Sequence, residues 1–561
     1  MRSSKLCIYI YTISMGNFFI YIKIEGLKFL VSLDFKSFKY GLSINFGDIN
    51  LENINIFVNT YLFPFSRNHE IFDITSLYWL EYLILLFIFS LFSLICLEKL
   101  NRNIRDSGYT LCIWYFFFLS IYSIFWYLPL VSAIFQSNIV TCFMYQNGAF
   151  CLTWFSYVVK TFIIFICFFF FCCIKHNERL LISFEYCLFI VGAILSSFYM
   201  ITSNSLLVIF LFMEMQSFIF YILCSMHNTK NTIENLSMEA CLKYFIYGSF
   251  ASAFFLFGVA LIYASIGTLD IYQIMYNLQD SYLNNSGILF LGAFLILIGI
   301  LFKLAIFPFH VWIGDVYQGA GYVTLIFLAI IPKLAFFVLF FNLYKLLFQF
   351  IPLCNDFLLF FAFCSIIYGA LTALYQTDIK RFVAFSAINN AGYILLLFIV
   401  QPNVVVPFYY LVIYLIVSFT FLIILNIMRS MVNVNIEKVS DLSLILSNNI
   451  FFSIFLVMTI LSFCGIPIFA GFFGKFILIK GLVSWYNYFL VIIFVLVTVL
   501  TCAYYIRLIR FIFNFKNLEL FQYSFSAISY NRVLPVLFLV SLNIFFMVYQ
   551  VPFFLFLNSC L

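Results

Sequence analysis

The sequence predicts an all-α, polytopic membrane protein, and its composition is the first observation behind that prediction. Of 561 residues, only 9% are charged, 65% are hydrophobic and 82 are Phe, whereas about 25% of a soluble globular chain is charged. The mean hydropathy is +1.12. This composition excludes a soluble enzyme, a nucleic-acid-binding protein and a disordered scaffold. The apolar runs are continuous, which excludes a transmembrane β-barrel, because barrel strands alternate polar and apolar residues.

The spacing of the apolar runs is the second observation, and it predicts about fourteen transmembrane helices. A helix needs roughly 20 mostly apolar residues to cross a bilayer. The predicted spans cover residues 76–97, 110–135, 149–174, 180–202, 205–227, 238–264, 286–307, 322–348, 355–375, 379–400, 404–427, 449–481, 484–512 and 533–556.

The first 75 residues differ from the rest, because charges recur along them. We expect an extramembrane extension here, and the partial alternation over 42–62 predicts strands. The apolar stretch 7–22 is short for a membrane span, which leaves one additional span as an alternative. No small-residue cleavage site follows it, so we do not expect a signal peptide.

Basic residues in the loops set the predicted orientation. They gather in the loops that follow odd-numbered spans, such as Lys99, Arg102, Lys175, Arg179 and Arg429. Because basic loops stay on the positive side of the membrane, we expect these loops to face the matrix or cytoplasm and both termini to face the other side.

Four ionisable residues, Glu214, Lys303, Lys333 and Lys475, fall well inside predicted spans. A charge at the bilayer centre costs about 2.5–3.5 kcal/mol on insertion scales, so such residues are functional by default. Burial lowers the pKa of a lysine and a nearby carboxylate raises it, so a Glu and several Lys can relay protons. The alternative is a purely structural buried ion pair.

Two further residues are candidates for this relay. Lys243 lies one turn inside its span and four residues after Glu239, so it fits either a relay role or a boundary role in which the side chain reaches the interface. His310 ends a predicted span and fits a relay or a boundary histidine equally well.

Three other charged residues lie nearer to predicted span ends. Lys160 precedes an apolar run of fourteen residues and can reach the interface with its side chain. Glu81 and Glu185 lie within two turns of span starts, where a boundary role is at least as good an explanation as a functional one.

Helix-breaking residues accompany the buried lysines. Pro308 follows Lys303, a proline directly precedes Lys333, and several glycines and a proline precede Lys475. Broken helices inside a membrane are tolerated only where they line a cavity or pack on protein. Their occurrence in two halves, spans four to eight and nine to thirteen, suggests an inverted-repeat transporter site.

The sixteen cysteines lie mostly singly within apolar stretches, and no C-x-x-C occurs. We interpret them as small core residues. This chain is therefore not expected to hold an iron–sulfur cluster or a structural zinc.

Around these residues the chain resembles the subunit 2 family (chain N in bacteria) of NADH dehydrogenase, the respiratory complex I. The resemblance covers about residues 180–510. The matching stretches are 212–223, 237–249, 262–270, 302–320, 332–337, 373–396 and 461–476.

The resemblance implies an antiporter-like fold of fourteen spans with two inverted five-helix repeats. It suggests a division into the extension 1–75, three helices over 76–179, repeats over 180–350 and 351–512, and a last helix within 513–561. It also implies a proton channel in which Glu214 pairs with Lys303, Lys333 relays, and Lys475 delivers toward the far side, driven by quinone reduction elsewhere in the complex.

The resemblance further implies no cofactor in this chain, with flavin, iron–sulfur clusters and quinone in other subunits. The expected partners are other membrane-arm subunits, including sister antiporter-like subunits, and lipids, without nucleic acid. The Phe-, Ile- and Asn-rich usage is typical of an A+T-rich genome and favours the mitochondrial inner membrane over a bacterial plasma membrane.

Three features depart from the family pattern. Asn390 stands where the family has a histidine, and an amide cannot titrate, so a proton there needs water or another group. The segment 319–324 reads GAGYVT in place of a proline-rich loop, which predicts a reshaped loop. Residues 1–75 have no family counterpart, which suggests contacts with lineage-specific subunits.

Two other functions remain open. The first is an Mrp-type cation/proton antiporter subunit, because those subunits share the fold and the buried Lys/Glu pattern. The second is an assembly scaffold whose lysines no longer work, a reading that Asn390 keeps open.

Overall fold

The computed structural model falls into two units, Met1–Tyr78 and Trp79–Leu561. The structure describes the backbone of residues 7–12, 17–24, 27–34 and 44–45, and residues 81–91 and 111–123 with single-residue gaps. It also describes residues 143–145, 148–173, 184–226, 233–279, 287–346, 348–401, 404–432, 437–443, 449–513, 530–548 and 550.

The first unit contains an antiparallel sheet with the strand order β1-β2-β3-β4. The strands are β1 (Cys7–Thr12), β2 (Asn17–Ile24), β3 (Leu27–Asp34) and β4 (Ile44–Asn45). Ile, Phe and Tyr dominate the first two strands, and these residues favour a pleated surface. The alternative of a transmembrane helix over 7–22 is therefore wrong. The predicted strands over 42–62 are found at β4, and the rest of that stretch lies outside the described residues.

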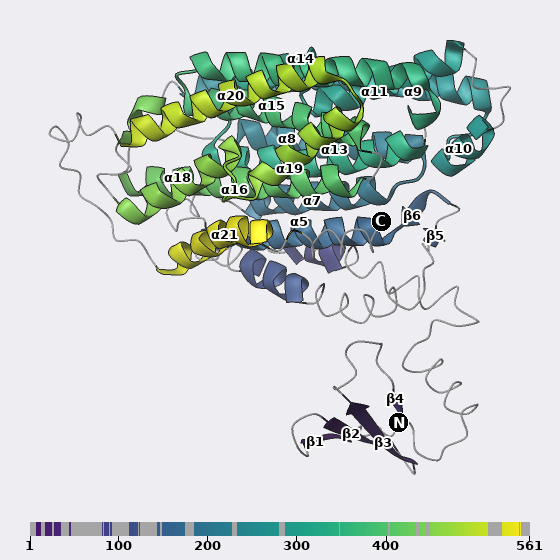
Figure 1. Ribbon diagram of the computed structural model, residues 1–561. Helices are drawn as coiled ribbons and strands as arrows, with labels where there is room; N and C mark the ends of the chain where they lie inside the picture. Colours follow the sequence, from purple (N-terminus) through teal and green to yellow (C-terminus); the bar gives the residue numbers. More distant parts are fainter. Residues whose placement is uncertain are drawn as a thin grey trace, which may run out of the picture. The chain divides into compact units, whose positions relative to one another are not determined.

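The second unit is almost entirely helical (Figure 1), which confirms the predicted fold class. Before the first labelled helix there are helical segments within 81–91 and at Leu111–Ile121 and a short hairpin of β5 (Phe143–Tyr145) and β6 (Phe150–Leu152). The helices up to the middle of the chain are α5 (Trp154–Cys173), α7 (Phe184–Thr202), α8 (Leu206–Ser225), α9 (Ile233–Ile266), α10 (Ile271–Gln279), α11 (Gly287–Lys303), α12 (Val311–Gly319) and α13 (Tyr322–Leu346). The later ones are α14 (Pro352–Tyr375), α15 (Ile379–Val400), α16 (Val405–Val432), α18 (Ile450–Cys464), α19 (Gly471–Ser484), α20 (Tyr488–Ile512) and α21 (Tyr530–Val548).

Nine helices in the described part of the chain are long and apolar enough to cross a membrane, and four shorter apolar helices accompany them. The chain is thus a multi-pass membrane protein, and its helices coincide with the predicted spans over most of their length. The predicted total of fourteen is compatible with this set. Sequence periodicity missed α10, a short helix in the loop between α9 and α11.

Two of the predicted spans are interrupted helices. The span predicted over 286–307 begins with α11, which ends at Lys303. The chain then continues through a non-helical stretch into the short helix α12. The span predicted over 449–481 consists of α18 and α19 with a break between them. The prediction of helix breaks next to Lys303 and before Lys475 is confirmed.

Three helices, α13, α15 and α16, form the centre of the bundle. Nearly all side chains in the apolar stretches of these helices are buried, whereas those of α9, α14 and α20 are mostly not. A helix that is apolar all round belongs in a core, and α16 is one. Figure 1 shows α20 and α14 along one side of the bundle and α16 beneath them. The central helices carry several of the buried polar side chains described below, among them Lys333 and Asn390.

Close helix contacts explain part of this packing. A Cβ on Gly258 of α9 would lie 2.6 Å from the backbone oxygen of Gly292 on α11. Small residues at such a crossing let two helix backbones approach closely in a membrane. This contact holds α11, and therefore Lys303 at its end, against α9.

Candidate functional site

The first break in the bundle positions Lys303. This residue is the last of α11, and its side chain is buried. Ala305 follows in the left-handed conformation with φ of 57°, which ends the helix. Beyond the break, the Trp312 indole N–H donates to the Phe302 carbonyl oxygen at 3.0 Å and ties α12 back to α11. The Lys303 Nζ has no hydrogen-bond partner among the described residues.

Glu214 lies on α8 and its electrostatic field acts on Lys303. Its side chain is half-buried, and Oε1 is buried without a hydrogen-bond partner in the described part of the chain. No hydrogen bond or ion pair joins the two side chains within the described residues, so the predicted pair is present only as an electrostatic interaction.

Lys333 lies in the middle of α13 and is buried. Its ammonium donates to the Tyr414 hydroxyl on α16 at 3.3 Å and lies 5.8 Å from the ring centroid of Tyr317 on α12. The expectation of a helix break here is wrong: α13 continues through Pro332. Protein packs around this helix on nearly all sides, which accommodates the missing backbone hydrogen bond.

The second break positions Lys475. Helix α18 ends at Gly465, which has φ of 81°, a conformation that favours glycine. Lys475, on α19, donates to the carbonyl oxygens of Phe463 at 3.0 Å and Cys464 at 3.1 Å. These carbonyls lie in the last turn of α18, at the negative end of a helix dipole, where a cation is stabilised. A Cβ on Gly471 would lie 2.0 Å from the Ser462 oxygen, so only glycine allows this close approach.

Asn390 on α15, the position of the family histidine, lies in the same interior. Its Nδ2 donates to the Ser386 carbonyl oxygen at 2.8 Å, and its Oδ1 accepts from the Tyr410 hydroxyl at 3.0 Å. The neighbouring Asn389 donates to the Tyr504 hydroxyl at 3.1 Å. Both amides thus hold tyrosine hydroxyls in place.

The structure separates Lys243 from the other candidates. This residue is more than one-third exposed, and its Nζ lies 2.7 Å from a Glu239 oxygen and 2.6 Å from an Asp315 oxygen. Arg381 contacts the second oxygen of Asp315 at 3.0 Å. The four residues form a network at one end of the bundle that joins α9, α12 and α15. The contact of Lys243 with Glu239, one helical turn earlier, is part of this network.

His310 lies in the break between α11 and α12 and is buried. Its ring centroid is 4.2 Å from that of Tyr368 on α14, and its Nδ1 has no hydrogen-bond partner among the described residues. The structure therefore places His310 in the interior near the end of α11 rather than at an exposed boundary.

Lys380, in the first turn of α15, has a structural role. It donates to the carbonyl oxygens of Gln318 at 3.2 Å and Ala320 at 2.6 Å, and its ammonium lies 4.8 Å from the centroid of the Tyr322 ring. It therefore fixes the short loop between α12 and α13, which replaces the family's proline-rich loop.

Sequence reasoning missed one buried ion pair. Glu81 and Lys160 contact each other, and both side chains are almost completely buried. The Lys160 ammonium also lies 5.8 Å from the centroid of the Phe198 ring. The Lys160 side chain is therefore enclosed within the protein. In the sequence, each of the two residues is explained by its position near a span end. The only signal for the pair is that two opposite charges occur on two early predicted spans. Glu185, by contrast, is exposed in the first turn of α7, as a boundary residue would be.

No cluster of three or more His, Cys, Asp or Glu side chains in the described ranges is placed to hold a metal ion. Apart from the Glu81–Lys160 pair, the buried lysines Lys303, Lys333 and Lys475 lie on three different helices. Tyrosines lie against Lys333 and Lys475.

The fold and these interior cations define an antiporter-like membrane subunit, and comparisons with known proteins agree. The family model "NADH:quinone oxidoreductase/Mrp antiporter, TM" matches residues 203–501. NADH-quinone oxidoreductase subunit N of Pelagibacter ubique is 33% identical over 343 residues, which are 60% of this chain and 70% of that protein. NADH-ubiquinone oxidoreductase chain 2 of Oenothera berteroana is 33% identical over 348 residues, 59% of this chain and 67% of that protein.

Solved structures share the fold. A chain of respiratory complex I from Thermus thermophilus aligns with a TM-score of 0.66 and 21% identity, over 84% of this chain and 97% of that one. A chain of the Mrp complex from Dietzia sp. aligns with a TM-score of 0.69 and 16% identity, over 87% and 97%. The chain belongs to the NADH:quinone oxidoreductase/Mrp antiporter family, and within it to the subunit N and chain 2 members. The resemblance seen in the sequence is thereby confirmed.

Proposed function

We propose that this chain is a proton-translocating membrane subunit of an NADH:quinone oxidoreductase, with Glu214, Lys303, Lys333 and Lys475 as its relay. One observation carries the proposal: none of the three lysines forms an ion pair with a carboxylate within the described residues, although all three are buried. The alternative of a structural ion pair therefore has no support at these lysines. Burial disfavours the charged form of an amine unless an opposite charge is close, so such residues are suited to exchanging protons.

The relay follows the order of the helices. Glu214 on α8 acts electrostatically on Lys303 at the first helix break. Lys333 lies beyond it and contacts α12 and α16 through tyrosines. Lys475 ends the relay at the second break, bound to backbone carbonyls. A change in the Glu214–Lys303 distance changes how strongly Lys303 holds its proton, and this sends a proton toward Lys333.

The subunit works within a larger assembly in this proposal. Its relatives are named as subunits of NADH-quinone and NADH-ubiquinone oxidoreductases, so we place it beside sister antiporter-like subunits in the membrane arm. Flavin, iron–sulfur and quinone chemistry belongs to other subunits and supplies the driving force. We assign the chain to the mitochondrial inner membrane on the basis of its composition, whereas its relatives include bacterial and plant proteins.

The test uses two lysines on the same helix. Lys475→Met removes a buried cation from α19, and Lys480→Met removes an exposed one five residues later. In the assembled complex, reconstituted into vesicles, we expect Lys475→Met to lower the number of protons moved per quinone reduced and Lys480→Met to leave it unchanged. Proton uptake is measured by quenching of a pH-sensitive dye after NADH addition.

Two results would reject the proposal. Normal pumping by Lys475→Met and Lys303→Ala complexes that assemble fully would support the scaffold function instead. A chain that does not co-purify with NADH:quinone reductase activity and that exchanges Na⁺ for protons would be an Mrp-type antiporter.

A further inference from the structure

The interior between Lys333 and Lys475 lacks the histidine of the family, and Asn390 does not replace it as a proton carrier. The amide of Asn390 binds a backbone carbonyl with its nitrogen and the Tyr410 hydroxyl with its oxygen. An amide does not titrate in the physiological range. A proton that travels between these two lysines therefore needs other groups.

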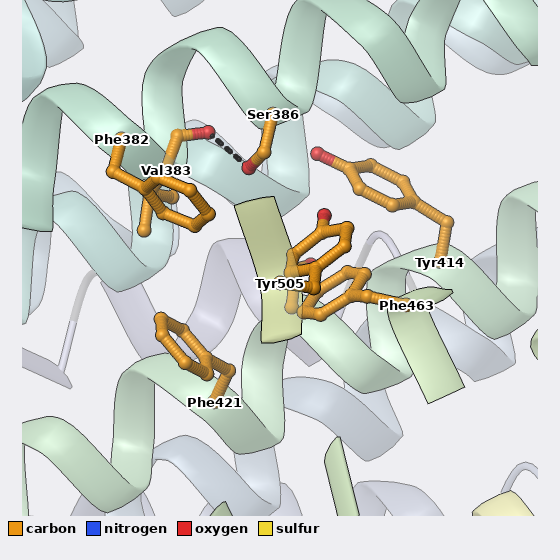
Figure 2. A pocket seen from close by; sticks show the side chains of 8 residues that line it. Phe382, Val383, Ser386, Tyr414, Phe421, Phe463 and Tyr505 are labelled. Atoms are coloured by element: carbon orange, nitrogen blue, oxygen red, sulfur yellow. Dashed lines mark hydrogen bonds between the residues drawn. The ribbon is translucent and has the colours of Figure 1, made fainter. Parts of the chain in front are cut away.

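Tyr414 is the group in direct contact with Lys333. The lysine is the donor in their 3.3 Å hydrogen bond, so the Tyr414 oxygen accepts and its own O–H proton is free to point elsewhere. Figure 2 shows this hydroxyl directed toward Ser386 and Tyr505 and into a pocket. The side chain thus contacts the lysine on one side and the pocket on the other.

The pocket has room for water. It is lined by Phe382, Val383, Ser386, Tyr414, Ser418, Phe421, Phe463 and Tyr505. The centre of a water molecule can occupy about 10 Å³ of it, which is about the volume that one water needs. Four residues of the lining carry a hydroxyl group, Ser386, Tyr414, Ser418 and Tyr505. A buried water typically makes about three hydrogen bonds, within a range of two to four.

Tyr505 on α20 forms the far wall of this pocket. Its hydroxyl is buried and makes no hydrogen bond with the described residues, while Ser386 and Asn390 lie next to it. Its ring stacks on that of Phe463 with centroids 5.4 Å apart. The backbone oxygen of Phe463 in turn accepts from Lys475. The Tyr505 side chain therefore lines the pocket and packs against the residue whose backbone oxygen binds the last lysine of the relay.

We propose that Tyr414 is a relay residue that takes a proton from Lys333 and passes one to water in this pocket, with Tyr505 as the next hydroxyl toward Lys475. In this step an N–H bond of the lysine breaks as an O–H bond forms on Tyr414, and the original Tyr414 O–H bond breaks as a new O–H bond forms on water. No electron is transferred, and the tyrosine ends the step neutral. The inference rests on the proposed function, because it adds residues to that same path.

The test removes one oxygen atom. Tyr414→Phe keeps the ring and loses the hydroxyl, and Tyr409→Phe is the matched control. Tyr409 is also buried on α16, but its hydroxyl donates to the Phe546 carbonyl oxygen on α21 at 2.9 Å, away from the pocket. In the reconstituted complex we expect Tyr414→Phe to slow NADH-driven proton translocation about tenfold or more, since a positioned proton-transfer group contributes about 10²–10⁴-fold. Tyr409→Phe should pump at the normal rate.

A third variant, Lys333→Met, separates this inference from the proposed function. If Lys333→Met is slow and Tyr414→Phe pumps as fast as Tyr409→Phe, the inference is overturned and the relay stands. If Lys333→Met pumps normally, both are overturned. Should Tyr414→Phe fail to assemble, Tyr505→Phe takes its place: a slow complex supports the path, and a normal rate overturns it.

Discussion

The buried pair of Glu81 and Lys160 allows a quantitative prediction about stability. Lys160→Met removes the cation and leaves the Glu81 carboxylate in a site where both side chains are at most 2% exposed. Solvent and salt screen such a site little. Removing one partner of a buried ion pair costs about 3–5 kcal/mol, because the other charge is left uncompensated. Glu81→Met should cost a similar amount.

The double variant gives the opposite expectation. Replacing both residues with Met removes both charges and keeps a similar side-chain volume. Apolar replacement of a complete buried pair is often neutral or stabilising, so the double variant should lie within about 1 kcal/mol of the parent chain. The two single costs sum to about 6–10 kcal/mol, so the coupling free energy is about 5 kcal/mol or more in magnitude, well above the value for residues that do not interact.

Denaturant unfolding in detergent, followed by tryptophan fluorescence, measures these free energies for the parent, both single variants and the double variant. Lys243→Met is the control, because that lysine is more than one-third exposed and should cost no more than about 1 kcal/mol. Additive single effects below about 1 kcal/mol each would show that Glu81 and Lys160 do not form a buried ion pair in the membrane.

Two further predictions concern the helix breaks and the exposed network. Gly471→Ala should destabilise the chain by about 1–3 kcal/mol through overpacking, because the added Cβ would lie 2.0 Å from the Ser462 backbone oxygen. Gly287→Ala is the control, because nothing lies within 4 Å of the added Cβ there. Equal thermal stability of the two variants would contradict the close approach. Asp315→Asn should lower the free energy of unfolding by about 1 kcal/mol or less, because the contact of Asp315 with Lys243 is half-exposed. A loss of unfolding free energy above about 3 kcal/mol in the same assay would mean that the network is buried in the protein.

The helical fold could be predicted from the sequence with little information beyond hydropathy. A backbone in lipid must satisfy its hydrogen bonds within one segment, so long apolar runs become helices at nearly the positions where they occur in the chain. Proline and glycine near Lys303 and before Lys475 marked the two breaks for the same reason. The rule failed at Pro332, because whether a proline interrupts a helix depends on the packing around it, and α13 is enclosed by its neighbours.

The sequence by itself determined the class of protein, the approximate spans and the ionisable residues that lie at membrane depth. It determined them because each depends on local composition and on the cost of burying charge. Only the tertiary structure decided which of these charges are paired. Lys160 has Glu81 as a buried partner and Lys243 has an exposed network, whereas Lys333 contacts a tyrosine. Such pairings join residues tens or hundreds of positions apart, and they follow from helix packing rather than from any local pattern.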